Sequence, residues 1–91
     1  MNTTLSEKIT VNAPHGLHLR AAVGLILLTR KYKSRVTLRK GSETASAQSV
    51  LGILHLEASR GTELEIISDG EDADQALNEI RDYFNSPQSW S

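Results

Sequence analysis

"SRVTLRKGSETASA", residues 34–47, contains two short alternating segments joined by a turn. Val36 and Leu38 alternate with polar residues in the first segment, and Ala45 and Ala47 do so in the second. Alternation with a period of two is typical of a strand with one buried face. The intervening "KGS" suits a tight turn because glycine accepts turn conformations easily. This stretch therefore predicts an antiparallel hairpin near the middle of the chain.

The N-terminal flank of the hairpin predicts a strand followed by a helix. Residues 7–13, "EKITVNA", alternate between apolar and polar side chains, which indicates a half-buried strand. Residues 18–31 are rich in alanine and leucine and predict a helix. The apolar part of this helix, residues 21–28, is bounded by arginines and is too short to cross a bilayer.

The C-terminal flank predicts a helix, a strand and a second helix. Ser49 is a favoured N-cap for a short helix through "VLGILHL", and residues 62–68 alternate as a strand. Residues 73–84 carry apolar side chains at helical spacing, and acidic residues, Asp72 among them, lie at the start, where the helix dipole favours negative charge. The order β-α-β-β-α-β-α predicts an α+β fold, a two-layer open-faced sandwich with helices on one face of an antiparallel sheet.

Length and composition exclude several classes of protein. The 91 residues predict a single domain, 1–91, with a core at about 5–85 and a flexible tail at 86–91. Ten basic residues against eleven acidic ones argue against a nucleic-acid-binding protein. The absence of cysteine excludes disulfides and thiolate metal sites. The N-terminus has no signal-peptide pattern, so a cytoplasmic monomer that does not insert into membranes is expected.

The stretch "PHGLHLR", residues 14–20, places two histidines and an arginine at the start of the first predicted helix. The first N–H groups of a helix lack internal partners and bind phosphate readily. A neutral imidazole at His18 keeps one ring lone pair and can act as a nucleophile, and Arg20 can grip two phosphate oxygens. The pattern therefore indicates a phosphoryl-accepting histidine. The alternatives are a surface histidine without function and a metal site on His15 and His18, which no nearby cysteine or carboxylate completes.

The stretch "NAPHGLHLRAA" resembles the active-site signature of the HPr family, the histidine-containing phosphocarriers of the bacterial phosphoenolpyruvate-dependent sugar phosphotransferase system. That signature reads Gly, aliphatic, His, any residue, Arg, Pro, Ala, and residues 16–20 and Ala22 match it. The segment 45–77 resembles the second family signature together with the family's C-terminal strand and helix, so the resemblance covers about 5–85. It implies a four-stranded sheet in the order 1-4-2-3 with three helices on one face.

The resemblance also implies a function for the first motif. His18 would accept a phosphoryl group on Nδ1 from phosphorylated enzyme I and pass it to IIA domains of sugar permeases. Arg20 would stabilise the phosphate, with Gly16, Leu19 and Ala21 forming the loop and helix start around it. Such a protein is a phosphoryl carrier with a covalent phosphohistidine rather than a stand-alone enzyme, and it needs neither cofactor nor metal.

The second motif carries two further expectations. Ser49 matches a serine that a dedicated HPr kinase/phosphorylase modifies in many bacteria, although a role as N-cap explains it equally well. Leu51 and Leu54 on the short helix, and Leu28 on the first helix, are expected to form a partner-binding surface.

The sequence departs from the family pattern at two places, so the resemblance does not determine which protein is the partner. Ala21 stands where the family usually has proline, and Leu27 and Leu28 stand where charged residues are common. Positions on a helix lie about 100° apart, so Leu25 and Ile26 are expected to face the sheet and Leu27 or Leu28 to face water. A regulatory paralogue, whose phosphorylation at His18 or Ser49 controls a protein partner instead of sugar uptake, is the alternative function. A ligand- or nucleic-acid-binding domain fits poorly because aromatic residues are few and charge is balanced.

Overall fold

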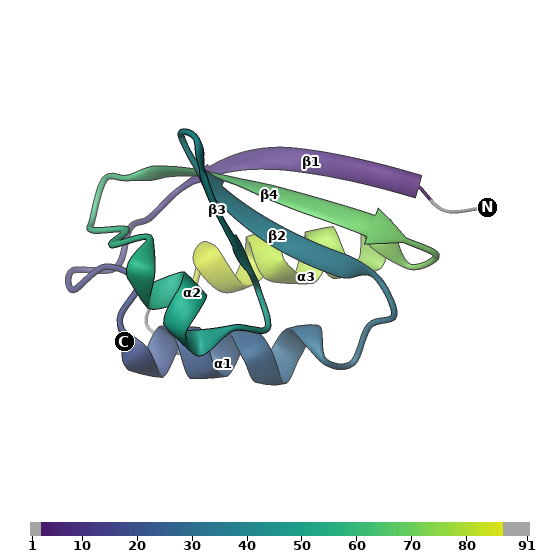
Figure 1. Ribbon diagram of the computed structural model, residues 1–91, viewed down its shortest axis with the longest axis horizontal. Coiled ribbons are helices and arrows are strands. Elements are labelled where there is room, and N and C mark those ends of the chain that lie inside the picture. The colour runs from purple at the N-terminus through teal and green to yellow at the C-terminus, as the bar shows by residue number, and fades with distance from the viewer. Residues whose placement is uncertain (1–2, 87–91) are drawn as a thin grey trace.

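The computed structural model describes residues 3–86, and its elements have the predicted order (Figure 1). Within this range the chain forms four strands and three helices, which are β1 (Thr3–Thr10), α1 (Leu19–Thr29), β2 (Arg35–Lys40), β3 (Glu43–Ser46), α2 (Val50–His55), β4 (Glu63–Gly70) and α3 (Ala73–Phe84).

The strands form one antiparallel sheet in the order β1-β4-β2-β3, as expected from the family resemblance. The central strand β4 pairs with β1 from Thr3↔Gly70 to Thr10↔Glu63. All three helices lie against the same face of the sheet, which leaves the other face open (Figure 1). The prediction of a two-layer α+β sandwich is therefore confirmed.

The core lies between the sheet and the helices, where alternate strand residues meet apolar helix faces. The residues expected to point inward from the strands are buried, and so is the apolar face of α3. They include Val36, Leu38, Ala45, Ala47, Leu64, Ile66, Ala76, Leu77, Ile80 and Phe84. Ser68 on β4 is also fully buried, and its hydroxyl has no hydrogen-bond partner among residues 3–86.

Strand β1 begins at Thr3 and ends at Thr10, whereas the sequence predicts a strand over 7–13. Pairing with β4 along its whole length extends β1 toward the N-terminus. Val11 leaves the ladder, but its N–H donates to the carbonyl of Thr62 at 2.9 Å and its side chain stays buried. The alternation of buried and exposed side chains therefore continues beyond the end of β1, although the strand pairing does not.

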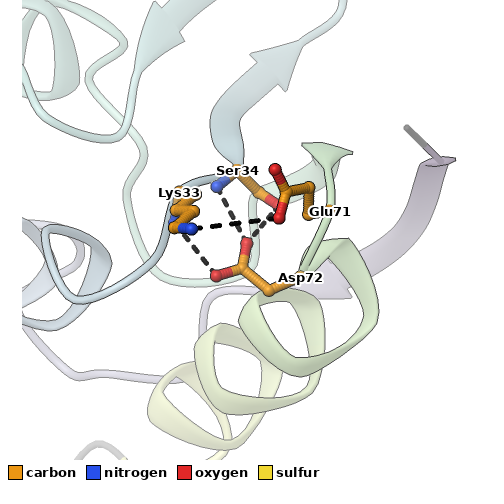
Figure 2. A network of polar contacts seen from close by, with 4 residues as sticks. All are labelled: Lys33, Ser34, Glu71 and Asp72. Atoms are coloured by element: carbon orange, nitrogen blue, oxygen red, sulfur yellow. Dashed lines mark hydrogen bonds and ion pairs between the residues drawn. The ribbon is translucent and has the colours of Figure 1, made fainter. Parts of the chain in front are cut away.

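Asp72 links two loops at the end of the sheet where α3 begins. It occupies the N-cap of α3 but makes no cap hydrogen bond there. Its carboxylate accepts the backbone N–H groups of Lys33 (3.0 Å) and Ser34 (2.9 Å) and the Ser34 hydroxyl (2.5 Å), as Figure 2 shows. These bonds, chiefly the one from the Ser34 hydroxyl, hold the pKa of Asp72 below its usual value. The acidic residue expected to act through the helix dipole therefore joins the β4–α3 turn to the α1–β2 loop.

The described chain continues for two residues beyond α3, Asn85 and Ser86. The Ser86 N–H donates to the carbonyl of Tyr83 at 3.2 Å. Of the tail predicted at 86–91, residues 87–91 lie outside the described residues. Between residues 3 and 86, no helix is long and apolar enough to cross a membrane.

Candidate functional site

His18 is the N-cap of α1, and its imidazole closes the start of the helix. The backbone of His18 is extended (φ −88°, ψ −176°), and Nδ1 accepts a hydrogen bond from the Arg20 N–H at 3.2 Å. The His18 carbonyl accepts the N–H of Ala22 at 2.9 Å. Because Nδ1 accepts a hydrogen bond, a neutral His18 carries its own proton on Nε2. The single lone pair of Nδ1 thus accepts the Arg20 N–H in the free protein, and this hydrogen bond has to open before Nδ1 can act as a nucleophile.

A glycine turn holds the loop before His18 against a neighbouring segment. Gly16 has φ +68°, and a Cβ at this position would lie 2.7 Å from the carbonyl oxygen of Ala58. Next to it, the Leu17 N–H donates to that same Ala58 carbonyl at 2.9 Å. Glycine is required here because both its backbone conformation and its surroundings disfavour a side chain.

The charges around His18 favour an anion. The first turn of α1 contains no acidic residue. The Arg20 side chain is exposed, and among residues 3–86 its guanidinium makes no ion pair. Helix N–H groups and an arginine together suit an anionic group such as a phosphoryl.

His15 lies beside His18 in the preceding loop. The two rings meet edge to face with centroids 6.4 Å apart, and His15 is exposed. In the part of the chain that the structure describes, no group of three or more His, Cys, Asp or Glu side chains could hold a metal ion.

The two other residues expected at the helix start differ in exposure. Leu19 is 58% exposed, whereas Ala21 is fully buried. The carbonyl of Ala21 accepts a hydrogen bond from the hydroxyl of Tyr83, on α3, at 2.7 Å. The phenol lies over Gly24. The contact of Tyr83 with Ala21 and Gly24 was not predicted from the sequence. The sequence feature that could have indicated a close neighbour is the glycine in the middle of α1.

Ser49 forms the N-cap of α2, as predicted. Its backbone is extended, and its hydroxyl oxygen accepts the N–H of Gly52 at 3.0 Å. The residue is half-buried. The hydroxyl therefore already has a structural role, independent of any modification.

The expected partner-binding leucines are not all on the surface. Leu51 is 81% exposed, but Leu54 is half-buried and packs against the core. On α1, Leu28 is likewise half-buried against the core, and Leu27 is the exposed residue, at 50%. Of the two residues, one of which was expected to face water, Leu27 is therefore the exposed one, because the rotation of α1 about its axis turns Leu28 toward the core.

Three exposed apolar side chains on α1 form a row. Leu19, Val23 and Leu27 are 58%, 42% and 50% exposed and are spaced four residues apart, so they lie on one face of the helix. We call these three residues the apolar stripe. It begins directly after His18.

Comparison with known proteins identifies the family. The model of the family described as "PTS HPr component phosphorylation site" matches residues 5–86. The chain belongs to the HPr family of phosphocarrier proteins. Phosphocarrier protein NPr of Shewanella violacea is 40% identical over 78 residues, 86% of each chain. Phosphocarrier protein HPr of Xylella fastidiosa (strain Temecula1) is 33% identical over 82 residues, 90% of this chain and 92% of the relative.

The fold agrees with solved HPr structures. The crystal structure of HPr-C-His from Thermoanaerobacter tengcongensis superposes with a TM-score of 0.89, covering 96% of this chain and 98% of that one. At 24% identity this likeness concerns the fold. Membership of the family is compatible with a role in sugar transport and with a regulatory one.

Proposed function

We propose that His18 accepts a phosphoryl group from phosphorylated enzyme I, which phosphoenolpyruvate charges, and passes it to IIA domains of sugar permeases in the cytoplasm. The observation that carries this proposal is the position of Nδ1, which lies at the start of α1 and accepts the Arg20 N–H. The Arg20 N–H that binds the Nδ1 lone pair in the free protein is thus placed to turn to the incoming anion when that lone pair attacks.

The transfer step uses this arrangement directly. The Nδ1 lone pair forms a bond to phosphorus, while the bond from phosphorus to the donor breaks and its electron pair stays on the donor. The Arg20 N–H, which faces Nδ1 in the free protein, then donates to a phosphoryl oxygen. Return of the phosphoryl group to an acceptor restores the original hydrogen bond. Catalysis consists mostly of positioning and charge stabilisation.

Labelling of the intact protein tests this proposal. With enzyme I and phosphoenolpyruvate, the mass should rise by one phosphoryl group that acid removes and base does not. His18→Ala should abolish the label, and His15→Ala, which removes the neighbouring ring, should retain it. A label that persists in His18→Ala contradicts the assignment.

Arg20 has a separate role that can be tested by a conservative change. Lysine keeps the positive charge but lacks the planar fork that holds two phosphate oxygens. Arg20→Lys should slow transfer without changing the melting temperature, because the side chain is exposed. An equal loss of stability and transfer would assign Arg20 a structural role instead.

The partner-binding surface in this proposal consists of the apolar stripe and Leu51. Each transfer partner must reach His18, and Leu19 at the end of the stripe is the next residue in the chain. Helices α1 and α2 lie side by side, so a partner on α1 lies close to α2 as well (Figure 1).

Ser49 supports a second, regulatory function. An HPr kinase/phosphorylase would modify its hydroxyl, and the added charge beside Leu51 would weaken binding of enzyme I. Ser49→Asp keeps a good N-cap and mimics part of that charge. It should therefore slow transfer from enzyme I while preserving the fold. Transfer at the wild-type rate would remove the support for regulation at Ser49.

A further inference from the structure

We infer that Tyr83 is a positioning residue for His18, whose hydroxyl fixes the first turn of α1. This inference rests on the phosphoryl-accepting role proposed for His18. Tyr83 belongs to α3, far from His18 in sequence, and neither the active-site motif nor the second signature includes it.

The contact is made at the turn that carries the imidazole. The Tyr83 hydroxyl donates to the Ala21 carbonyl at 2.7 Å. In that same turn, the Arg20 N–H holds Nδ1 of His18 and the Ala22 N–H holds the His18 carbonyl. Movement of this turn therefore displaces the donor that holds the imidazole and the donor that holds the His18 backbone. Tyr83 connects the turn to α3, which packs on the sheet.

Gly24 makes room for the phenol. A Cβ at Gly24 would collide with the Tyr83 hydroxyl oxygen and would lie 3.2 Å from Cζ. Glycine is less favourable than alanine inside a helix, so its presence in the middle of α1 needs a reason. The close approach of Tyr83 supplies that reason. Gly24 and Tyr83 thus form a matched pair across the α1–α3 interface.

The phenol ring of Tyr83 also contacts a residue of its own helix, α3. Its ring meets the ring of Phe84 edge to face, with centroids 6.0 Å apart, and Phe84 is fully buried. Partial burial raises the pKa of Tyr83 to about 12, so the hydroxyl keeps its proton at neutral pH.

Tyr83→Phe removes the donor and leaves the ring. At saturating enzyme I, the transfer rate should fall about two- to tenfold, the range expected when one neutral hydrogen bond is lost. The KM for enzyme I should stay unchanged, because Tyr83 is not part of the apolar stripe. The ¹⁵N chemical shift of His18 Nδ1, which reports its hydrogen bond, should also change. Tyr32→Phe is the matched control, since Tyr32 is a half-buried tyrosine packed beside Lys31.

Gly24→Ala gives an independent test in a protein that keeps the hydroxyl. The new methyl group should displace the phenol and slow transfer as Tyr83→Phe does, although alanine is the better helix former. In the Tyr83→Phe background, Gly24→Ala should have a smaller effect, because the most severe overlap is gone.

The outcomes separate this inference from the proposed function. If the wild-type protein is not labelled on His18, the proposed function fails. If the wild-type protein is labelled, and Tyr83→Phe and Gly24→Ala both match its rate and its His18 Nδ1 shift, the positioning role of Tyr83 is refuted while the proposed function stands. A loss of rate in Tyr32→Phe equal to that in Tyr83→Phe refutes it too.

Discussion

Leu27 offers a quantitative test of the proposed docking of enzyme I on the apolar stripe. Complete burial of a leucine side chain contributes about 1.5–3 kcal/mol. Because Leu27 is 50% exposed in the free protein, covering the exposed half contributes about 1 kcal/mol. Leu27→Ala should therefore weaken binding of enzyme I about fivefold. Isothermal titration calorimetry with the organism's own enzyme I measures this change directly.

Salt provides the second part of the test. Residues 21–28 of α1 carry no charge, so binding through the apolar stripe should depend only weakly on ionic strength. Leu27→Lys should weaken binding more than Leu27→Ala, because a charge then has to lose water in the interface. The melting temperature of both variants should stay close to that of the wild type, since Leu27 is not among the core residues.

Leu28→Ala is the matched control on the same helix. Leu28 packs against the core, so its truncation should lower the melting temperature and leave affinity for enzyme I unchanged. Wild-type affinity in Leu27→Ala would refute the docking role of the stripe. A steep fall in wild-type affinity with added salt would show that charge contacts dominate instead.

Four other predictions concern stability. Ser49→Ala removes the cap on Gly52 and should cost about 1 kcal/mol, which lowers the melting temperature by about 4–8 °C in calorimetry, whereas Ser49→Asp should preserve it. Hydrogen bonds, of which the one from the Ser34 hydroxyl is the largest cause, lower the pKa of Asp72 from 3.8. The stabilisation that they give the folded protein is complete above that pH and is lost as the pH falls through the lowered pKa. Acid unfolding of Asp72→Asn should therefore lack this loss of stability. Burial raises the pKa of Tyr83 from 10.0 to about 12. The contribution of the protonated Tyr83 hydroxyl to stability is therefore complete below pH 10 and is lost as the pH rises through about 12. Alkaline unfolding of Tyr83→Phe should lack that loss. Ser68→Ala should leave the urea midpoint unchanged or raise it, because the buried Ser68 hydroxyl has no hydrogen-bond partner in the part of the chain that the structure describes; a marked fall would show a bond to buried water.

Local patterns in the sequence predict most of the fold. The inward residues of β2, β3 and β4 and the apolar face of α3 can be read from period-2 and period-3.6 alternation, because burial of one face dictates those patterns. The start of β1 at Thr3 could not be predicted this way. It depends on pairing with Gly70, and a partner strand so distant leaves no mark on the local sequence.

The candidate site likewise contains residues that local sequence predicts and contacts that it does not. His18 could be singled out from its place beside Arg20 at a predicted helix start and from the family motif, and Ser49 because serine is a favoured N-cap. The contact between Tyr83 and Ala21 joins residues 62 positions apart in the sequence, and the choice between Leu27 and Leu28 depends on the rotation of α1 about its axis. Both are set by tertiary packing, which periodicity alone does not determine.

The pairing of β1 with β4 has a consequence for the newly made protein. During translation β1 leaves the ribosome first, but its partner Glu63–Gly70 emerges only after α1 and α2, and Tyr83 comes later still. Contacts between distant parts of a chain form late in folding. His18 is therefore synthesised early but acquires its fixed surroundings only when α3 has been released. On the proposed function, a ribosome-bound chain that ends before α3 is therefore expected to be a poor acceptor of the phosphoryl group.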